Sequence, residues 1–223
     1  MPRRLALGVL ASGEGTTLDA LAEQAAGGHV PARVAIVLSD RPYAPVLEKA
    51  RRRGLATAVL PLKGTPPDKW AARATQILKE AGVELVILAG FLSIVPPTFT
   101  KTWEGRAINI HPSLLPRYGG KGLYGDRVHA AVLAAGDAET GATIHLVTDD
   151  VDGGPVLAQQ RVMVEPGDTP ERLRLRVQAA ERVALYSVIA HFAEGEWPLP
   201  YRDPSGRTRS RRTDSDPLSG PSA

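Results

Sequence analysis

The first part of the chain alternates short apolar runs with longer stretches whose apolar side chains recur every three or four positions. The apolar runs predict four strands, at residues 5–10, 33–39, 57–60 and 85–88. The stretches between them predict helices, two of which end at Gly54 and Gly82, as helix ends commonly do. Strands that alternate with helices need crossover connections, which make a sheet parallel and cover both of its faces. We therefore predict an α/β fold, a doubly wound, mostly parallel sheet with helices on both faces.

The second part of the chain continues this pattern and then loses it. Strands are predicted at residues 107–110, 143–147 and 156–164, the last two extending the sheet. A long helix follows, with Thr169 as its N-cap and Pro170 as its first residue, and runs to about residue 194. From residue 202 onward Ser, Gly, Pro and Arg dominate without an apolar period. The prediction is one folded domain over residues 1–201 and a disordered polar tail over residues 202–223.

Composition restricts the class of protein. The chain has 223 residues, 43% of them hydrophobic, which is enough for the core of a single α/β domain. It contains no cysteine, so neither disulfides nor cysteine-based sites can form. The formal charge is +3, but residues 202–223 hold five Arg and three Asp, which leaves the rest at +1.

Two classes of partner are not expected. No basic stripe interleaved with aromatic residues is present, so nucleic acid is not an expected partner. The apolar run at residues 5–10 is too short to span a membrane and resembles no export signal. We therefore expect a cytoplasmic protein with small-molecule partners.

One predicted strand runs directly into polar residues. Residues 107–110 lead into His111 and Pro112, and ligands bind at the carboxyl ends of strands in α/β sheets. Asn109 and His111 are two positions apart, so they face the same side of an extended strand. A lone histidine in such a place is as often a hydrogen-bonded structural residue. The acidic, glycine-containing loop at residues 149–155 shifts this balance, because Asp152 can supply a carboxylate to the imidazole.

Two further loops are candidate binding elements. Residues 12–17, Ser-Gly-Glu-Gly-Thr-Thr, join a strand to a helix, where free backbone N–H groups and the helix dipole favour a phosphate. An ordinary capped helix start is the alternative. Residues 89–97 carry apolar side chains suited to a flat aromatic ligand or to packing on the next helix. His129 is expected to hydrogen bond to a neighbouring group, since the five histidines are too scattered for a metal site.

These motifs, in this order, resemble the active-site signature of the folate-dependent formyltransferases. The resemblance rests on Asn-Ile-His-Pro-Ser-Leu-Leu-Pro at residues 109–116 and Asp-Gly-Gly-Pro at residues 152–155, and it covers about residues 5–200. It implies a Rossmann-like formyltransferase fold, a catalytic domain in residues 1–201, 10-formyltetrahydrofolate as the formyl donor, and no metal. The loop at residues 12–18 narrows it to members whose acceptor is the amine of 5-phosphoribosylglycinamide, in de novo purine biosynthesis.

The resemblance also assigns individual residues. It implies that the catalytic residues are Asn109, His111 and Asp152. Its phosphoribosylglycinamide site corresponds to Gly15, Thr16, Thr17, Gln178 and Glu181. Its folate site corresponds to Leu92, Ser93, Ile94, Val95, Asn109, Thr148, Asp149, Asp150, Val151 and Asp152. Thr17 departs from the family, which typically has Asn there, and Pro67 stands near the place of a basic residue that can approach the folate tail.

The three catalytic residues suit formyl transfer. Asn109 can donate its amide N–H to the formyl oxygen as negative charge develops there. A protonated His111 can stabilise the same charge and act as general acid, while Asp152 orients the imidazole and raises its pKa. A covalent intermediate on Ser113 is the less favoured alternative, because the sequence supports no triad.

Three other functions share parts of this pattern. A formyltetrahydrofolate hydrolase uses the same residues on water, but usually carries a further amino-terminal domain. Methionyl-tRNA formyltransferases add a carboxyl-terminal nucleic-acid-binding domain, for which the polar tail is too short. A non-catalytic folate- or nucleotide-binding protein keeps the loops without needing Asn109, His111 and Asp152 together. The expected assembly is a monomer or a homodimer.

Overall fold

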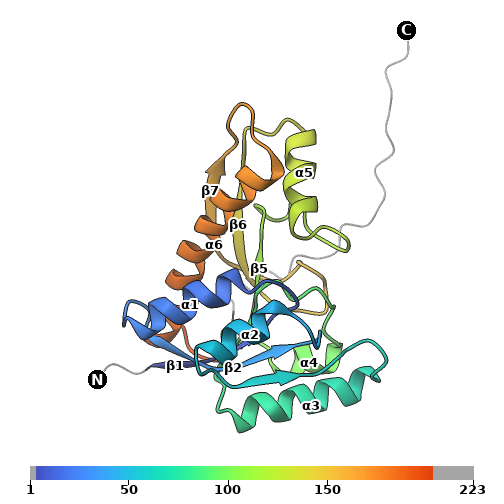
Figure 1. The fold of residues 1–223 in the computed structure, drawn as a ribbon, viewed down its shortest axis with the longest axis vertical. Coiled ribbons are helices and arrows are strands. Elements are labelled where there is room, and N and C mark those ends of the chain that lie inside the picture. Colours follow the sequence, from blue (N-terminus) through green and yellow to red (C-terminus); the bar gives the residue numbers. More distant parts are fainter. Residues whose placement is uncertain (1–3, 203–223) are drawn as a thin grey trace.

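The chain forms one seven-stranded sheet with helices on both faces. The computed structural model describes residues 4–202, so all but the first residue of the predicted polar tail lies outside the described part. The strands are β1 (Leu5–Leu10), β2 (Ala32–Ser39), β3 (Thr57–Val59), β4 (Leu85–Leu88), β5 (Ala107–His111), β6 (Glu139–Leu146) and β7 (Val156–Met163). Their order in the sheet is β3-β2-β1-β4-β5-β6-β7 (Figure 1).

The sheet is parallel from β3 to β5 and antiparallel beyond it. β1 lies between β2 and β4, with Val9 opposite Val37 on one side and Ile87 on the other. All six residues of β1 are buried, as expected of a central strand covered on both faces. Because the chain runs outward from β1 in both directions, the carboxyl ends of β1 and β4 lie at a switch point of the sheet, where α/β folds bind ligands.

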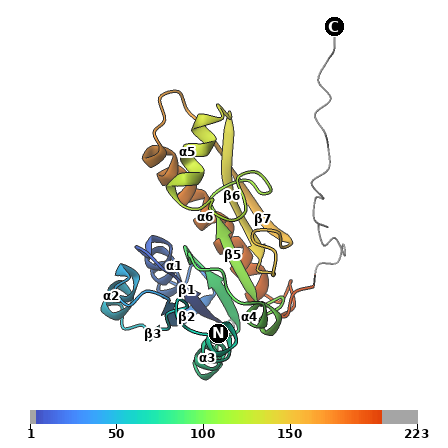
Figure 2. The same cartoon turned by 90° about the vertical axis from the view of Figure 1, so that its right-hand side faces the viewer.

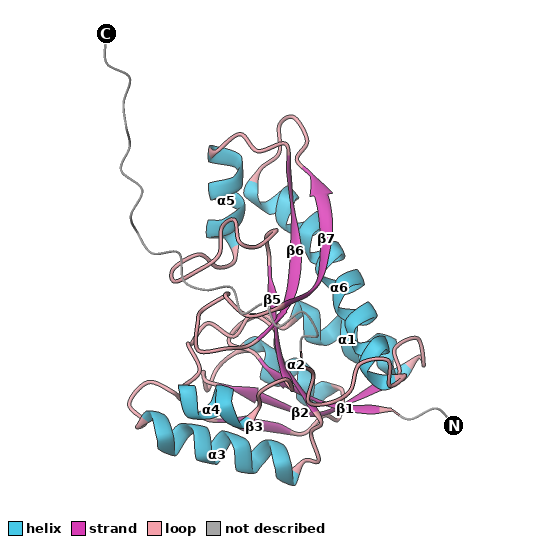
Figure 3. Ribbon diagram, turned by 180° about the vertical axis from the view of Figure 1, so that it is seen from behind, coloured by secondary structure: helices cyan, strands magenta, loops and turns pink. Residues whose placement is uncertain are grey.

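Within residues 4–202, six helices pack around the sheet. They are α1 (Thr16–Ala26), α2 (Pro45–Arg52), α3 (Pro67–Glu80), α4 (Pro97–Thr102), α5 (Asp126–Ala134) and α6 (Pro170–Ala193). One core joins Leu7 and Val9 of β1 to buried residues of α1, α2 and α6. A second core, on the other face, joins Leu10 and Leu38 to α3 and α4, which lie together in Figure 3. The predicted doubly wound, mostly parallel sheet is therefore confirmed.

β5, β6 and β7 extend away from the rest of the sheet, with α5 and α6 packed beside them (Figure 2). The predicted strand at residues 143–147 is too short at its amino-terminal end, because β6 begins at Glu139. Glu139, Thr140 and Gly141 interrupt the apolar pattern, yet they pair with the last three residues of β7. At Gly141 a Cβ atom would collide with the Gln160 carbonyl, so the two backbones approach closely there.

Residues 4–202 include no helix that is both long enough and apolar enough to cross a bilayer.

Candidate active site

A cavity of about 680 Å³ opens at the carboxyl ends of β1, β4 and β5. Residues predicted for the site line it from five parts of the chain. They are Gly15, Thr16 and Thr17 after β1, Leu92, Ser93, Ile94 and Val95 after β4, Asn109 and His111 on β5, Thr148, Asp150, Val151 and Asp152 after β6, and Gln178 and Glu181 on α6. The topology of the sheet therefore brings together residues that are far apart in the sequence.

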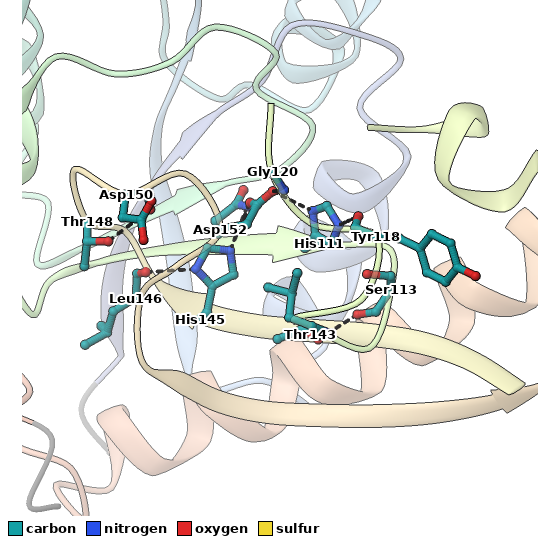
Figure 4. Close-up of polar contacts among 12 residues, drawn as sticks. His111, Ser113, Tyr118, Gly120, Thr143, His145, Leu146, Thr148, Asp150 and Asp152 are labelled. Atoms are coloured by element: carbon teal, nitrogen blue, oxygen red, sulfur yellow. Dashed lines mark hydrogen bonds and ion pairs between the residues drawn. The ribbon is translucent and has the colours of Figure 1, made fainter. Parts of the chain in front are cut away.

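Asp152 contacts both Asn109 and His111 (Figure 4 shows His111 and Asp152). Asn109 Nδ2 donates to Asp152 Oδ1 at 3.3 Å, and His111 Nδ1 lies 3.4 Å from Asp152 Oδ2. Asn109 and His111 share one face of β5, as their spacing predicts. One carboxylate therefore contacts an amide and an imidazole through its two oxygens.

The neighbours of His111 determine which of its ring nitrogens carries a hydrogen. Nε2 lies 2.8 Å from the Tyr118 carbonyl, which can only accept, so Nε2 carries a hydrogen. Nδ1 is then the position that gains a proton when the imidazole becomes charged, and it faces Asp152. Burial lowers the pKa of His111 below 6.5, although Asp152 and the Tyr118 carbonyl act in the opposite direction. The expected direction of the Asp152 effect is therefore confirmed, since its carboxylate raises the pKa of His111, but desolvation outweighs it and the net pKa is lowered.

Asp152 remains ionised in this setting. Burial by itself raises its pKa, but His145, His111 and the backbone N–H of Gly120 together hold the pKa of Asp152 below its usual range. Gly120 N donates to Oδ2 at 2.9 Å, which links the carboxylate to the glycine-rich loop after β5. Asp152 has a left-handed backbone, with φ of 56°, a conformation that Asp and Asn tolerate better than most residues.

His145 is a fourth member of this cluster that the sequence analysis missed. It pairs with Asn109 across β5 and β6, and its Nε2 lies 3.0 Å from Asn109 Nδ2 and 3.5 Å from Asp152 Oδ1. Nδ1 donates to the Leu146 carbonyl at 2.9 Å, so a neutral His145 accepts from Asn109 at Nε2. The sequence does hold a signal for His145. It lies two positions after Thr143 in a predicted strand, so alternation places the two side chains on the same face.

The loop before α1 is shaped for an anion. Gly15 has a φ of 72°, and a Cβ there would lie 2.5 Å from Val46 Cγ2, so a side chain fits neither the conformation nor the space. No side chain caps α1, which leaves its first backbone N–H groups free at the cavity beside Thr16 and Thr17. This geometry favours phosphate binding over an ordinary capped helix start.

Gln178 and Glu181 face the cavity from α6, one helical turn apart. Neither side chain has a hydrogen-bond partner within residues 4–202. Burial raises the pKa of Glu181 to about 7, with Arg182 acting in the opposite direction. Glu181 is therefore a carboxyl group that changes charge near neutral pH at the cavity wall.

The predicted folate residues are placed unevenly. Leu92 and Ile94 remain 41% and 54% exposed and line the cavity, as suits contact with an apolar ligand. Thr148, Asp150 and Val151 also line it. Asp149 does not, because its carboxylate accepts a hydrogen bond from Thr100 at the end of α4. Pro67 begins α3 and is likewise absent from the lining.

Two more cavity residues carry buried nitrogens without a hydrogen bond, although Arg174 Nε forms an ion pair with Asp126. His129 is 1% exposed, and its Nδ1 has no hydrogen-bond partner among the described residues. The expectation that His129 bonds to a neighbour is therefore wrong for this atom, because α5 places the ring against the cavity. Burial lowers the pKa of His129. Arg174 lines the cavity one turn before Gln178 and lies 3.2 Å from Asp126.

Ser113 is not placed for nucleophilic chemistry. It is fully buried, and its hydroxyl donates to the Arg117 carbonyl at 2.6 Å. Its carbonyl accepts from Thr143 Oγ1 (Figure 4). Within residues 4–202, no three His, Asp or Glu side chains are grouped so that they could hold a metal ion.

Comparison with known proteins agrees with this geometry. The family model for formyl transferase matches residues 5–189. The chain is 38% identical over 190 residues to phosphoribosylglycinamide formyltransferase of Escherichia coli, covering 84% of this chain and 86% of that protein. It is 37% identical over 195 residues to the chloroplastic phosphoribosylglycinamide formyltransferase of Arabidopsis thaliana, covering 86% of this chain and 67% of that protein.

A solved structure shows the same relationship. Glycinamide ribonucleotide transformylase 1 from Symbiobacterium toebii superposes with a TM-score of 0.80 at 38% identity, covering 88% of this chain and 91% of the other. The predicted Rossmann-like formyltransferase fold is confirmed by this similarity. The chain belongs to the formyl transferase family, in its phosphoribosylglycinamide formyltransferase branch.

Proposed function

We propose that the chain transfers the formyl group of 10-formyltetrahydrofolate to the amine of 5-phosphoribosylglycinamide, a step of de novo purine biosynthesis. The observation that carries this proposal is the combination in one cavity of the Asn109, His111 and Asp152 cluster with the uncapped start of α1. The first can act on a formyl group, and the second can hold a phosphate. The acceptor is the one that the relatives' names state.

The reaction needs no covalent enzyme intermediate. The acceptor amine attacks the formyl carbon, a new C–N bond forms, and the formyl oxygen takes up negative charge. Collapse of this intermediate breaks the bond to the folate nitrogen. The amine loses one proton and the folate nitrogen gains one, so the exchange balances without a further reactant. The residues must therefore stabilise the oxyanion and move this proton.

Asn109 serves as the oxyanion donor in this proposal. Its Nδ2 already donates toward His145 at 3.0 Å and toward Asp152 at the longer distance of 3.3 Å. The formyl oxygen replaces the longer contact, because that hydrogen bond is the weaker of the two. His145 then holds the amide in place through the bond that remains. His145 is therefore a positioning residue for Asn109.

His111 and Asp152 handle the proton. His111 becomes charged at Nδ1, and the ionised Asp152 lies 3.4 Å from that atom. The charged imidazole stabilises the nearby oxyanion, and Asp152 favours this charged form. Nδ1 delivers its proton toward the departing folate nitrogen by exchanging its contact with Asp152 for the substrate. Since burial keeps the pKa of His111 below 6.5, the charged imidazole is a minority form at neutral pH before substrate binds.

The two substrates are assigned to different groups of residues in the cavity lining. Gly15, Thr16 and Thr17 hold the phosphate at the start of α1, with Gln178 and Glu181 on the rest of the phosphoribosyl group. The folate lies along Leu92 to Val95 and the loop that includes Thr148, Asp150, Val151 and Asp152. Asp149 supports this loop from behind through Thr100. The proposal includes a cytoplasmic location, a catalytic domain over residues 1–201, and a monomer or homodimer that needs no metal.

The direct test measures formyl consumption with each candidate acceptor. The purified chain is mixed with 10-formyltetrahydrofolate and either phosphoribosylglycinamide, initiator methionyl-tRNA or no acceptor. We expect rapid release of tetrahydrofolate with phosphoribosylglycinamide alone, together with the formylated ribonucleotide. Release at the same rate without an acceptor identifies a hydrolase and contradicts the proposal. Binding of both ligands without turnover identifies a non-catalytic binding protein.

A further inference from the structure

Asp40 bonds to two loops whose residues line the cavity. It follows β2, while residues 12–17 follow β1 and residues 89–95 follow β4, and these three strands are neighbours in the sheet. All three segments therefore leave the same edge. Ser93 is among the residues that line the cavity, but Asp40 and Ser12 are not. Any effect of Asp40 on a ligand must be transmitted through these loops.

The Asp40 carboxylate bonds to both loops. Oδ1 accepts from Ser12 Oγ and Oδ2 accepts from Ser93 Oγ, each at 2.6 Å. The Ser12 hydroxyl in turn accepts from Leu92 N at 2.9 Å, and Ser12 N donates to the Gly90 carbonyl at 3.0 Å. Ser12 is only 2% exposed. Hydrogen bonds from a hydroxyl to a carboxylate are short and stronger than neutral ones, so the three segments form one bonded unit.

A purely local role for Asp40 does not fit these contacts. An aspartate that only ends a strand bonds to the backbone of its own turn. Here both carboxylate bonds cross the fold, to residues 28 and 53 positions away. The local turn is held instead by Ser39, whose hydroxyl accepts from Arg41 N at 3.1 Å.

We propose that Asp40 is a positioning residue that couples the two substrate sites of the cavity. The inference rests on the proposed function, because it needs the phosphoribosyl group on residues 12–17 and the folate on residues 89–95. A ligand that orders one loop orders the other through the Ser12, Asp40 and Ser93 hydroxyl–carboxylate bonds. Each ligand therefore tightens binding of the other, and by the same factor, since coupling is reciprocal.

The test measures this coupling without turnover. Tetrahydrofolate is titrated into the full chain alone and in saturating phosphoribosylglycinamide, a pair that cannot react because no formyl group is present. We expect wild-type Kd for tetrahydrofolate to fall by about fivefold or more when the ribonucleotide is bound. In Asp40→Asn the charge is lost, and one of the two short hydroxyl–carboxylate bonds can persist only as a weaker, neutral N–H···O bond. The coupling factor then falls below about twofold, while each ligand alone still binds.

Four further variants separate coupling from general damage. Glu80→Gln removes the same charge at the end of α3, outside the cavity lining, and should keep the wild-type factor. Ser93→Ala removes the hydrogen bond between Ser93 and Asp40, whereas Ser93→Thr keeps the hydroxyl. Only Ser93→Ala should reduce the coupling factor. Ser93→Ala combined with Asp40→Asn should be no lower than either single variant, because the two changes break one connection. If Asp40→Asn fails to fold by thermal melting, the Ser93 pair decides the question.

Specific outcomes overturn the inference. A wild-type factor near one, or an unchanged factor in Asp40→Asn and Ser93→Ala, shows that the bonds do not couple the sites. Either result leaves the proposed function intact. Failure of the proposed function has a different signature, which is wild-type protein that does not bind phosphoribosylglycinamide at all.

Discussion

The two ends of the cavity are built differently. At the end formed by β5 and β6, polar contacts of 3.0–3.5 Å join Asn109, His111, His145 and Asp152 into one cluster. At the end formed by α5, α6 and the start of α1, polar groups face the cavity without such partners. Among the described residues these are the side chains of Gln178 and Glu181, the Nδ1 atom of His129 and the uncapped N–H groups of α1.

This difference indicates how each end meets its ligand. A cluster that is already hydrogen bonded is pre-organised, and a substrate group enters by replacing one of its weaker contacts. A buried polar group without a partner costs about 1–3 kcal/mol, a cost that a bound ligand removes. Changes at the first end should therefore act mainly on turnover, and changes at the second mainly on ribonucleotide binding.

The largest effect is expected for Asp152→Asn. The substitution keeps the shape of the loop, because Asn also tolerates the left-handed backbone at this position. It removes the charge that raises the pKa of His111, so the imidazole should titrate at a still lower pH. We expect kcat to fall by roughly 10²- to 10⁴-fold with little change in ribonucleotide binding. The measurements are kcat and KM against pH, and the His111 titration followed by NMR.

Asp149→Asn is the matched comparison on the same loop. Its carboxylate bonds to Thr100 outside the cavity, so its loss of activity should be much smaller. An unchanged His111 pKa and near-normal turnover in Asp152→Asn contradict a catalytic role for Asp152. Those results would leave Asp152 as a residue that shapes the turn before Gly153.

The same contrast between the two ends shows what the sequence could predict. Strand and helix alternation was enough to predict the doubly wound sheet, because the apolar periods of β1, β2 and β4 are unambiguous. Asn109 and His111 could be placed on one face because their spacing is local. The contact of both with Asp152 depends on the pairing of β5 with β6, which the order of motifs suggests but does not determine.

The site features that the sequence could not predict depend on strand register and on burial. His145 enters the cluster only because β6 pairs antiparallel with β5 so that it lies opposite Asn109. The net pKa of His111 depends on desolvation, which has no signature in neighbouring residues. Asp149 and Asp150 are adjacent and chemically alike, yet α4 draws Asp149 away from the cavity. His129 lacks a partner for Nδ1 for a similar reason, since only the packing of α5 determines what surrounds it.

A smaller effect is expected for Glu181→Gln at the other end. A neutral amide keeps hydrogen-bonding capacity, so KM for the ribonucleotide should rise by about tenfold at most, with kcat nearly unchanged. A kcat loss as large as that of Asp152→Asn would contradict the distinction between the two ends. Initial rates over a range of ribonucleotide concentrations supply both constants.

The stability contributions of the two ends of the cavity should change with pH in opposite directions, because Glu181 lies at one end and His111 at the other. Its pKa is raised to about 7, so its stabilising contribution is full below pH 4.5 and is lost as pH rises through 7. The pKa of His111 is lowered, so its contribution is present above pH 6.5 and is lost as pH falls through the folded pKa. Between pH 4.5 and about 7, Glu181→Gln should therefore lose less Tm than the wild type, while the loss on the acid side stays. A parallel Tm profile for the two proteins would show that Glu181 does not titrate there.

The smallest effect is expected from the end of the chain. Among described residues, none after Glu181 lines the cavity, so neither of its ends should depend on residues 203–223. The predicted disordered tail lies almost entirely outside the described residues and stays a prediction. Ending the chain after Arg202 should leave kcat, KM and Tm nearly unchanged, because a segment without an apolar period buries little surface. Activity and thermal melting of the shortened chain check this directly.

Ending the chain after Glu196 is the contrasting control, because the residues just before the tail pack on the core. Trp197, Leu199 and Tyr201 contact the core that includes β1 and α6, and Tyr201 N donates to the Gly105 carbonyl at 2.8 Å. Gly105 has a φ of 65° and no room for a Cβ beside the Tyr201 backbone, so this contact is close. Removing three partly buried side chains costs about 3 kcal/mol or more, which corresponds to a Tm loss of roughly 10 °C. Comparable losses in both shortened chains would show that the tail itself docks on the domain.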